Sequence, residues 1–254
     1  MDQVVPDPVN RPASGGAYPR LMNQPRRETT YPPAATRWLD RALPADAPTP
    51  AVIKIEQRGQ FDANGRWLSF KAVGTYQARP LSFDWQARLS LLPGVWIAAT
   101  DGHADGEGWG GSKMWGLKSL GHRQGPDVLV LQVVRNIGEL AWLPDLARAD
   151  PALAWREAGD DAFEISTVAG DREVVVRFDV DDQGDVTCAS SPSRSLGGPE
   201  GSAEAPWRCD YSDHREFDGV RIPASVVATF DLDEGPWEYC RGEVVSVSRQ
   251  GGAA

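Results

Sequence analysis

Long stretches of this chain alternate polar and apolar side chains with a period of two, and short turn sequences separate them. Residues 67–73, for example, read Trp-Leu-Ser-Phe-Lys-Ala-Val. Because successive side chains of a β-strand point to opposite faces, this pattern predicts strands that are buried on one side. Asp-Ala-Asn-Gly at 62–65 and Asp-Asp-Gln-Gly at 181–184 are typical turns between such strands. After residue 51, about ten or eleven short strands succeed one another.

Only two segments show helical spacing. Ala35 and Trp38 lie on one face of a predicted helix over 34–43. A second helix is predicted over 138–148, where Pro144 either kinks the helix or opens a new turn. Strands and helices do not alternate as they do in a parallel α/β fold. We therefore predict a mainly β protein: a curved antiparallel sheet, or half-open β-barrel, with two or so helices on its concave side.

The same patterns predict one main domain. Residues 1–32 lack periodicity and are read as a flexible N-terminal arm, residues 33–249 as a single half-barrel domain, and residues 250–254 as a flexible tail. The Ser/Pro/Gly-rich residues 190–205 are predicted to form a loop. The glycine-rich segment 102–116 is predicted to be a loop or a hairpin of bulged strands.

Charge and hydropathy exclude several classes of protein. A net charge of −10 disfavours nucleic acid and anionic membrane surfaces as partners. No apolar run approaches the ~20 residues that a membrane-spanning helix needs. The first residues show no basic start followed by an apolar stretch, so we expect a cytoplasmic location. The three cysteines have no metal-binding spacing and are expected to be reduced thiols.

Tryptophan is unusually frequent in this chain. Its N–H needs a hydrogen-bond partner when the ring is buried, so each tryptophan restricts the structure around it. Core packing accounts for most of them, and we expect a minority to line a wide aromatic cavity. The ten residues are Trp38, Trp67, Trp85, Trp96, Trp109, Trp115, Trp142, Trp155, Trp207 and Trp237.

A series of short motifs, in a fixed order over residues 35–248, resembles an uncharacterised bacterial family of unknown function. Its members are similar to the half-barrel lipoprotein carriers, the LolA/LolB/LppX-like group. The motifs include Arg-Trp-Leu at 37–39, Gln-Arg-Gly-Gln-Phe at 57–61, Phe-Asp-Trp-Gln-Ala at 83–87, Gly-Glu-Leu-Ala-Trp-Leu-Pro at 138–144 and Gly-Val-Arg-Ile-Pro at 219–223. The resemblance implies a half-open barrel whose hollow side holds an apolar ligand, with helices plugging it. An enzyme of violacein-type pigment biosynthesis uses this half-barrel without a cofactor, so the fold can also host chemistry.

Three residues are candidates for acid–base chemistry. His103 lies between Asp101 and Asp105, and a carboxylate near a histidine at the mouth of an apolar cavity can move protons. Glu139 lies on the second predicted helix, where desolvation would raise its pKa; it could equally be a first-turn acid that complements the helix dipole. Asp84 lies between two aromatic residues, and the sequence does not decide whether it points inward.

The acidic residues around His103 do not predict a metal site. The spacing of a calcium loop fails at its twelfth position, and a zinc site would need more than one histidine or cysteine here. Phosphate-binding and dinucleotide-binding motifs are missing from the sequence as well, so we expect no cofactor.

The ligand expected from these patterns is an apolar small molecule. The side chains predicted to bind it are Trp85, Trp109, Met114, Trp115, Trp142, Tyr211 and Tyr239. We expect the cavity to be bounded by segment 102–116 and by the helix at 139–142. The preferred interpretation is a cofactor-independent cyclase, cycloaddition enzyme or isomerase, which would act mainly by positioning its substrate. The alternative is a carrier that binds a lipid-like ligand without converting it. Arg194, in the predicted 190–205 loop, is a possible clamp for an acid group of the ligand.

Overall fold

The computed structural model describes residues 30–63, 65–197 and 203–251. The chain divides into two units, Met1–Thr30 and Tyr31–Ala254. The first unit lies almost wholly outside the described residues, as does the end of the predicted tail. The second unit contains the sheet and the helices.

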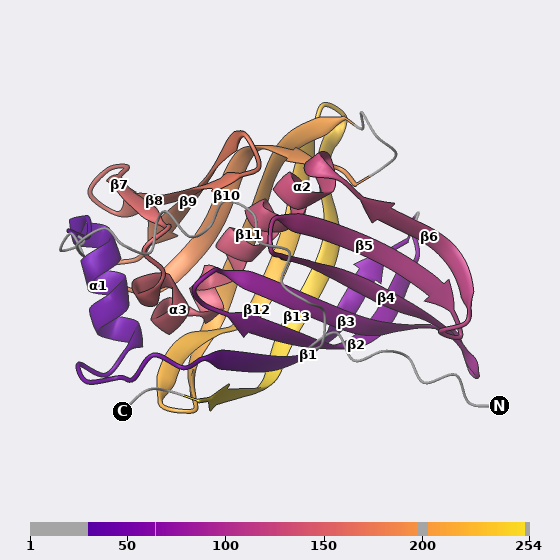
Figure 1. Ribbon diagram of the computed structural model, residues 1–254, viewed down its shortest axis with the longest axis horizontal. Helices are drawn as coiled ribbons and strands as arrows, with labels where there is room; N and C mark the ends of the chain where they lie inside the picture. The colour runs from indigo at the N-terminus through magenta and orange to yellow at the C-terminus, as the bar shows by residue number, and fades with distance from the viewer. Residues whose placement is uncertain (1–29, 64, 198–202, 252–254) are drawn as a thin grey trace. The chain divides into compact units, whose positions relative to one another are not determined.

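Among the described residues, thirteen strands form one antiparallel sheet that curves but does not close (Figure 1). The order is β6-β5-β4-β3-β2-β1-β13-β12-β11-β10-β9-β8-β7. The sheet consists of two meanders, β1–β6 and β7–β13, which are joined because β1 pairs with β13. The strands are β1 Val52–Asp62, β2 Trp67–Gln77, β3 Ser82–Leu92, β4 Val95–Ala104, β5 Glu107–Met114, β6 Lys118–Gln124, β7 Ala154–Glu157, β8 Ala162–Ala169, β9 Arg172–Val180, β10 Val186–Ser195, β11 Glu204–Phe217, β12 Val220–Leu232 and β13 Gly235–Gln250. The predicted fold class is confirmed.

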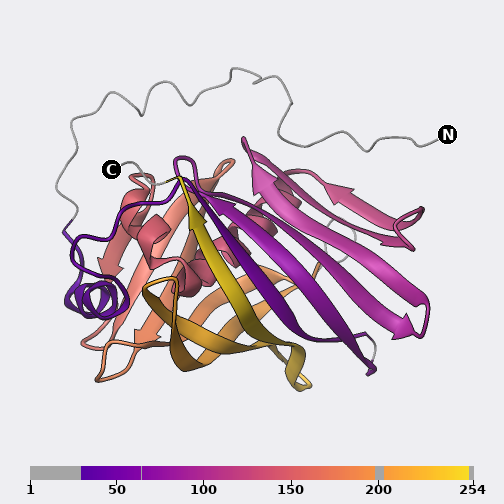
Figure 2. The same cartoon turned by 90° about the horizontal axis from the view of Figure 1, so that it is seen from below.

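The helices between β6 and β7 lie inside the curve of the sheet (Figures 1 and 2). The long helix α2 contacts β4–β6 on one arm of the sheet and β8–β10 on the other. It therefore bridges the two meanders from the concave side. The helices are α1 Pro33–Ala42, α2 Pro126–Gly138, the 3-10 helix η3 Glu139–Trp142 and α3 Pro144–Ala149.

The period-two pattern separates the two faces of the sheet. In β1, Ile53 and Ile55 are fully buried on the concave face, whereas Lys54 and Glu56, which alternate with them, are exposed. The helices cover this apolar face. Gly138, at the end of α2, shows how close the contact is, since a Cβ there would lie 2.7 Å from the ring of Trp207.

The helical prediction was incomplete. The sequence pattern did not predict α2, because this helix is contacted by both arms of the sheet and is apolar around most of its circumference. Pro126 at its first position and Asp127 in its first turn are favourable start signals. The helix predicted over 138–148 is instead η3 followed by α3, and Pro144 opens the second of them.

The predicted loop over 190–205 is partly strand, and of the two alternatives for segment 102–116 the structure has the hairpin. β10 continues to Ser195, so the connection within 190–205 is shorter than expected. Segment 102–116 is the end of β4 and a regular β5, joined by a turn at Asp105-Gly106 where both residues have positive φ. Gly108 in β5 allows close packing, because a Cβ there would lie 2.4 Å from the backbone of Leu129 in α2.

Candidate ligand site on the concave face

A row of polar residues on α2 and η3 faces the arm of the sheet that contains β2–β5. Gln132, Arg135, Asn136 and Glu139 have the spacing i, i+3, i+4 and i+7, which places them on one helical face. This spacing is the signal that the sequence carried for the network. The sequence analysis identified only Glu139.

Arg135 is the centre of this network. Its Nε donates to Glu139 Oε1 at 2.8 Å and its Nη1 to Asp101 Oδ2 at 2.9 Å, while its guanidinium lies 4.6 Å from the ring centre of Trp85. Burial acts to lower the pKa of Arg135, but the carboxylates of Glu139 and Asp101 outweigh burial and raise it. Arg135 is therefore a permanent, fully compensated cation.

The other oxygens of the two acids are also engaged. The Tyr76 hydroxyl donates to Glu139 Oε2 at 2.9 Å, and Gln132 Nε2 donates to Asp101 Oδ1 at 3.1 Å. Burial and the neighbouring Glu139 carboxylate raise the pKa of Tyr76 well above its usual value. The network is thus closed on itself, as expected of polar groups that stabilise a helix on a sheet.

His103 lies in β4 beneath α2 and is only 6% exposed. Its Nε2 is 2.9 Å from Asn136 Nδ2, and because an amide nitrogen can only donate, Nε2 is the acceptor. Burial lowers the pKa of His103 to about 4. The imidazole is therefore neutral at pH 7, with its basic nitrogen already occupied.

Asp84 lies on the opposite face of the sheet. Phe83 and Trp85 on either side of it are buried on the concave side, so the alternation of β3 directs Asp84 outward. Its Oδ1 is buried without a hydrogen-bond partner among the described residues, and burial raises its pKa. In the structure, His103 and Glu139 therefore both contact α2, whereas Asp84 lies on the other face of the sheet.

Of the aromatic residues predicted to bind ligand, four are held by structural contacts. Trp85 is buried and donates to Gln57 Oε1 at 2.9 Å. Trp142 donates to the Pro223 carbonyl at 3.1 Å, and the Tyr211 hydroxyl donates to the Gly138 carbonyl at 2.9 Å. Trp109 covers Gly102, where a Cβ would lie 2.5 Å from the indole.

Two further predicted residues lie at the far end of the β4–β5–β6 arm. Met114 is partly exposed and pairs with Ile97, while Trp115 lies in the following turn, is half exposed and donates to the Gly94 carbonyl. The cavity expected beside residues 139–142 is occupied by η3 itself, whose residues are buried. The predicted residues therefore do not converge on one internal pocket.

A second buried arginine lies on the other arm of the sheet. Arg194 in β10 is 9% exposed, and its Nη1 donates to the Tyr239 hydroxyl at 2.9 Å. Trp207 Nε1 donates to the same hydroxyl at 2.9 Å, and the guanidinium lies 4.6 Å from the centre of the Trp207 ring. Burial raises the pKa of Tyr239, although the nearby Arg194 opposes this. Tyr239 and Arg194 are the two residues of this cluster that were predicted from the sequence to contact a ligand.

Two β-bulges direct these side chains inward. β12 and β13 pair Ala228 with Cys240 and then Thr229 with Glu238, which leaves Tyr239 as the extra residue. A similar irregularity in the β10–β11 pairing lies between Ser191 and Arg194. Bulges commonly redirect a side chain next to a functional site. The two bulges meet at the contact between Arg194 and Tyr239.

Partly exposed rings continue from this contact across the concave face. Tyr239 lies 5.1 Å from Phe230, 5.7 Å from Trp237 and 6.4 Å from Phe61, measured between ring centres. Phe61, Trp237 and Tyr239 keep part of their surface exposed, unlike the aromatic residues under α2. We call this group the concave aromatic patch; it consists of Phe61, Arg194, Trp207, Phe230, Trp237 and Tyr239.

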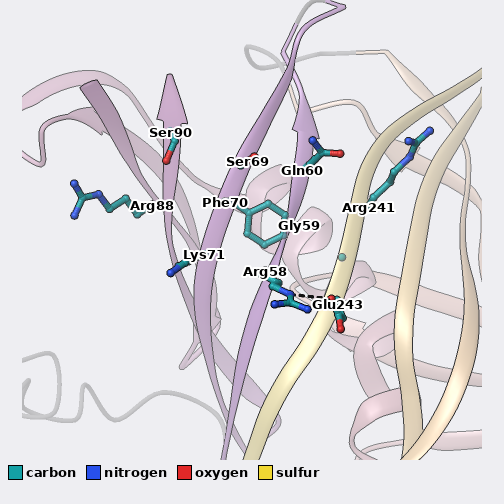
Figure 3. A pocket seen from close by; sticks show the side chains of 11 residues that line it. Arg58, Gly59, Gln60, Ser69, Phe70, Lys71, Arg88, Ser90, Arg241 and Glu243 are labelled. Carbon is teal, nitrogen blue, oxygen red and sulfur yellow. Dashed lines mark hydrogen bonds and ion pairs between the residues drawn. The ribbon is translucent and has the colours of Figure 1, made fainter. Parts of the chain in front are cut away.

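A groove of about 710 Å³ lies on the outer face of β1, β2, β3 and β13 (Figure 3). Its charged residues are exposed and mostly engaged with neighbours. Arg58 pairs with Glu243 at 2.8 Å, Arg241 pairs with Glu238, and Arg88 lies over the ring of Trp96. These contacts are those of a solvated sheet surface, so the concave aromatic patch is the stronger candidate site.

Within residues 30–63, 65–197 and 203–251, no group of three acidic, histidine or cysteine side chains is placed to hold a metal ion. The three cysteines are free thiols, and burial raises the pKa of Cys240 to about 12. None of the described helices is long and apolar enough to cross a membrane.

Solved structures similar to this chain include a LolA superfamily protein from Nitrosomonas europaea, with 11% identity and a TM-score of 0.42 over 87% of this chain and 93% of that one. A putative outer membrane lipoprotein-sorting protein domain from Vibrio parahaemolyticus has 9% identity and a TM-score of 0.43 over 87% and 92%. A DUF1329 family protein from Desulfovibrio piger has 11% identity and a TM-score of 0.41 over the same shares.

No curated protein matches the chain. The model of a family of unknown function matches residues 22–242, which confirms the resemblance to an uncharacterised family. The chain belongs to this family, DUF6544.

Proposed function

We propose that the protein binds an apolar small molecule at the concave aromatic patch. The observation that carries the proposal is the contrast within the concave face: its rings are fully covered where α2 and η3 lie, and partly exposed at Phe61, Trp237 and Tyr239. Aromatic side chains offer large apolar contact areas with little conformational freedom to lose, which suits binding of an apolar molecule.

The neighbouring polar groups support binding better than catalysis. Glu139 is neutralised by Arg135, and the basic nitrogen of His103 accepts from Asn136. His103 lies in β4 beneath α2 and Glu139 at the start of η3, so neither belongs to the patch. A cyclase or isomerase activity remains a prediction from the sequence. It would require these groups to exchange their present partners for a substrate. The cytoplasmic location also remains a prediction, which cell fractionation would test.

Binding is tested with Nile red, a neutral dye whose fluorescence rises in apolar surroundings. We expect saturable binding to the full chain, and we expect Trp237→Ala to weaken it about tenfold, because a ring of the patch contributes on the order of 1–2 kcal/mol. Trp115→Ala is the matched control, since this half-exposed tryptophan lies in a turn outside the patch. Absence of saturable binding, or equal effects of the two substitutions, would contradict the proposal.

A further inference from the structure

We infer that the molecule bound at the concave aromatic patch carries a carboxylate, and that Arg194 binds this group through its Nε and Nη2 atoms. The inference rests on the proposed function, because it specifies the chemistry of the ligand at the same site. It makes the ligand an amphipathic acid with a charged end at Arg194 and an apolar body along the rings.

Arg194 has no countercharge among the described residues. Arg194 is nine-tenths buried, yet no carboxylate among the described residues lies within ion-pair distance of it. Its Nε is buried and has no hydrogen-bond partner in the described parts of the chain. A buried cation without an anion is costly, since the lost hydration of the charge is not replaced. The site is therefore complementary to an anion that the described residues do not supply.

The guanidinium of Arg194 is held in one orientation. Nη1 is held by the Tyr239 hydroxyl at 2.9 Å, which fixes the direction of the planar group. The Nε and Nη2 hydrogens point along the opposite edge, parallel to each other. Two parallel donors match the two oxygens of a carboxylate and form a bidentate pair. Since Nη2 also makes no hydrogen bond to a described residue, both donors of this edge lack a partner in the described part of the chain.

Aromatic rings surround the guanidinium of Arg194. The guanidinium carbon lies 4.6 Å from the ring centre of Trp207 and 5.7 Å from that of Phe230. Phe230 in turn contacts Trp237, at 6.0 Å between ring centres. An acid bound to Arg194 would therefore place its carbon chain directly against the partly exposed rings. Low polarity around the pair would strengthen it, because charges interact more strongly away from water.

The test compares two probes that differ only at one end, dodecanoate and dodecanol. Each displaces Nile red from the full chain at pH 7.5, where the acid is ionised. We expect dodecanoate to bind roughly 10- to 100-fold more tightly, as one charge-assisted bidentate contact provides. If both probes displace the dye equally well, the proposed function stands and the carboxylate inference is overturned. If neither probe nor the dye binds, the proposed function itself fails.

Variants then locate the acid group. Arg194→Gln should remove the preference for dodecanoate while leaving dodecanol binding unchanged. Arg194→Lys should recover only part of it, because an ammonium keeps the charge but loses the two-donor edge. Arg88→Gln, which removes an exposed cation from the outer face, is the matched control and should keep the full preference. Circular dichroism checks that each variant folds. A preference that persists in Arg194→Gln would overturn the assignment.

Discussion

Two buried arginines on the concave face have opposite electrostatic surroundings. Arg135, in the last turn of α2, is paired with Glu139 and Asp101 and lies against the Trp85 ring. Arg194, on the opposite arm, also lies against a tryptophan, but it has a phenol where Arg135 has two carboxylates. Although both guanidinium groups stack on a tryptophan, one cation is compensated and the other has no acid partner within the described residues.

The difference separates a structural region from a binding region. Around Arg135, every oxygen of the two acids has a partner, so a ligand would have to break existing bonds. Around Arg194, one edge of the guanidinium is unused and the neighbouring rings are partly exposed. The first region therefore holds the helix on the sheet, and the second is the region for which we propose ligand binding.

The largest expected effect comes from removing the compensated arginine. Arg135→Met leaves Glu139 and Asp101 without their countercharge under α2, and we expect it to lower the free energy of unfolding by roughly 3–5 kcal/mol. Urea denaturation followed by circular dichroism measures this. A loss below about 1 kcal/mol, which is typical of exposed ion pairs, would show that the network does not hold the helix.

The second largest effect is the pH dependence of the unfolding free energy that His103, beneath α2, contributes. The pKa of His103 is lowered by burial from 6.5 to about 4 in the folded protein. The unfolded chain therefore binds the proton more tightly between these pH values. This histidine's contribution to stability is complete above pH 6.5 and is lost as the pH falls towards 4, by roughly 3 kcal/mol in all.

Urea unfolding at pH 7.5 and at pH 5 tests this for the wild type and for His103→Gln, which keeps an acceptor for Asn136. The wild type should lose more stability than the variant between the two pH values. Carboxylates and His214 titrate in both proteins, so their contributions cancel in the difference. Equal losses would show that His103 is not buried as a neutral base.

The sheet was largely predictable, whereas the site was predicted only at Tyr239 and Arg194. Strand alternation in segments such as 67–73 reports burial directly, so local pattern was enough to predict the antiparallel sheet. The helix α2 was missed because both of its sides are covered. The candidate site depends on the bulges at Tyr239 and before Arg194, and the extra residue of a bulge is set by pairing between strands. No local sequence pattern records that pairing.

Because pairing between strands is not recorded in local sequence, the sequence also did not decide which of His103, Glu139 and Asp84 would lie close together. His103 and Glu139 were predicted from residue type, and both contact neighbours on α2 or η3. Asp84 faces away because strand direction is fixed by its partners, which the sequence alone left open. Their catalytic roles stay predictions.

A smaller effect is expected from the phenol that orients Arg194. Tyr239→Phe removes the acceptor shared by Arg194 Nη1 and Trp207 Nε1. Leaving buried donors unsatisfied costs about 1–3 kcal/mol, so we expect a loss of roughly that size on urea unfolding. Dodecanoate binding should weaken as well, because the guanidinium is no longer fixed. Unchanged binding would show that Tyr239 does not position Arg194.

The smallest effect should come from the direct counterpart of the first substitution. Arg194→Met removes one hydrogen bond and the contact with the Trp207 ring, which destabilises the fold. It also removes a buried cation that has no acid partner among the described residues, which stabilises it. These contributions oppose each other, so without ligand we expect the unfolding free energy to change by less than about 1 kcal/mol in either direction. The same urea experiment, run beside Arg135→Met, gives the comparison directly. A loss as large as that of Arg135→Met would mean that Arg194 is also a structural cation, and the distinction between the two regions would be lost.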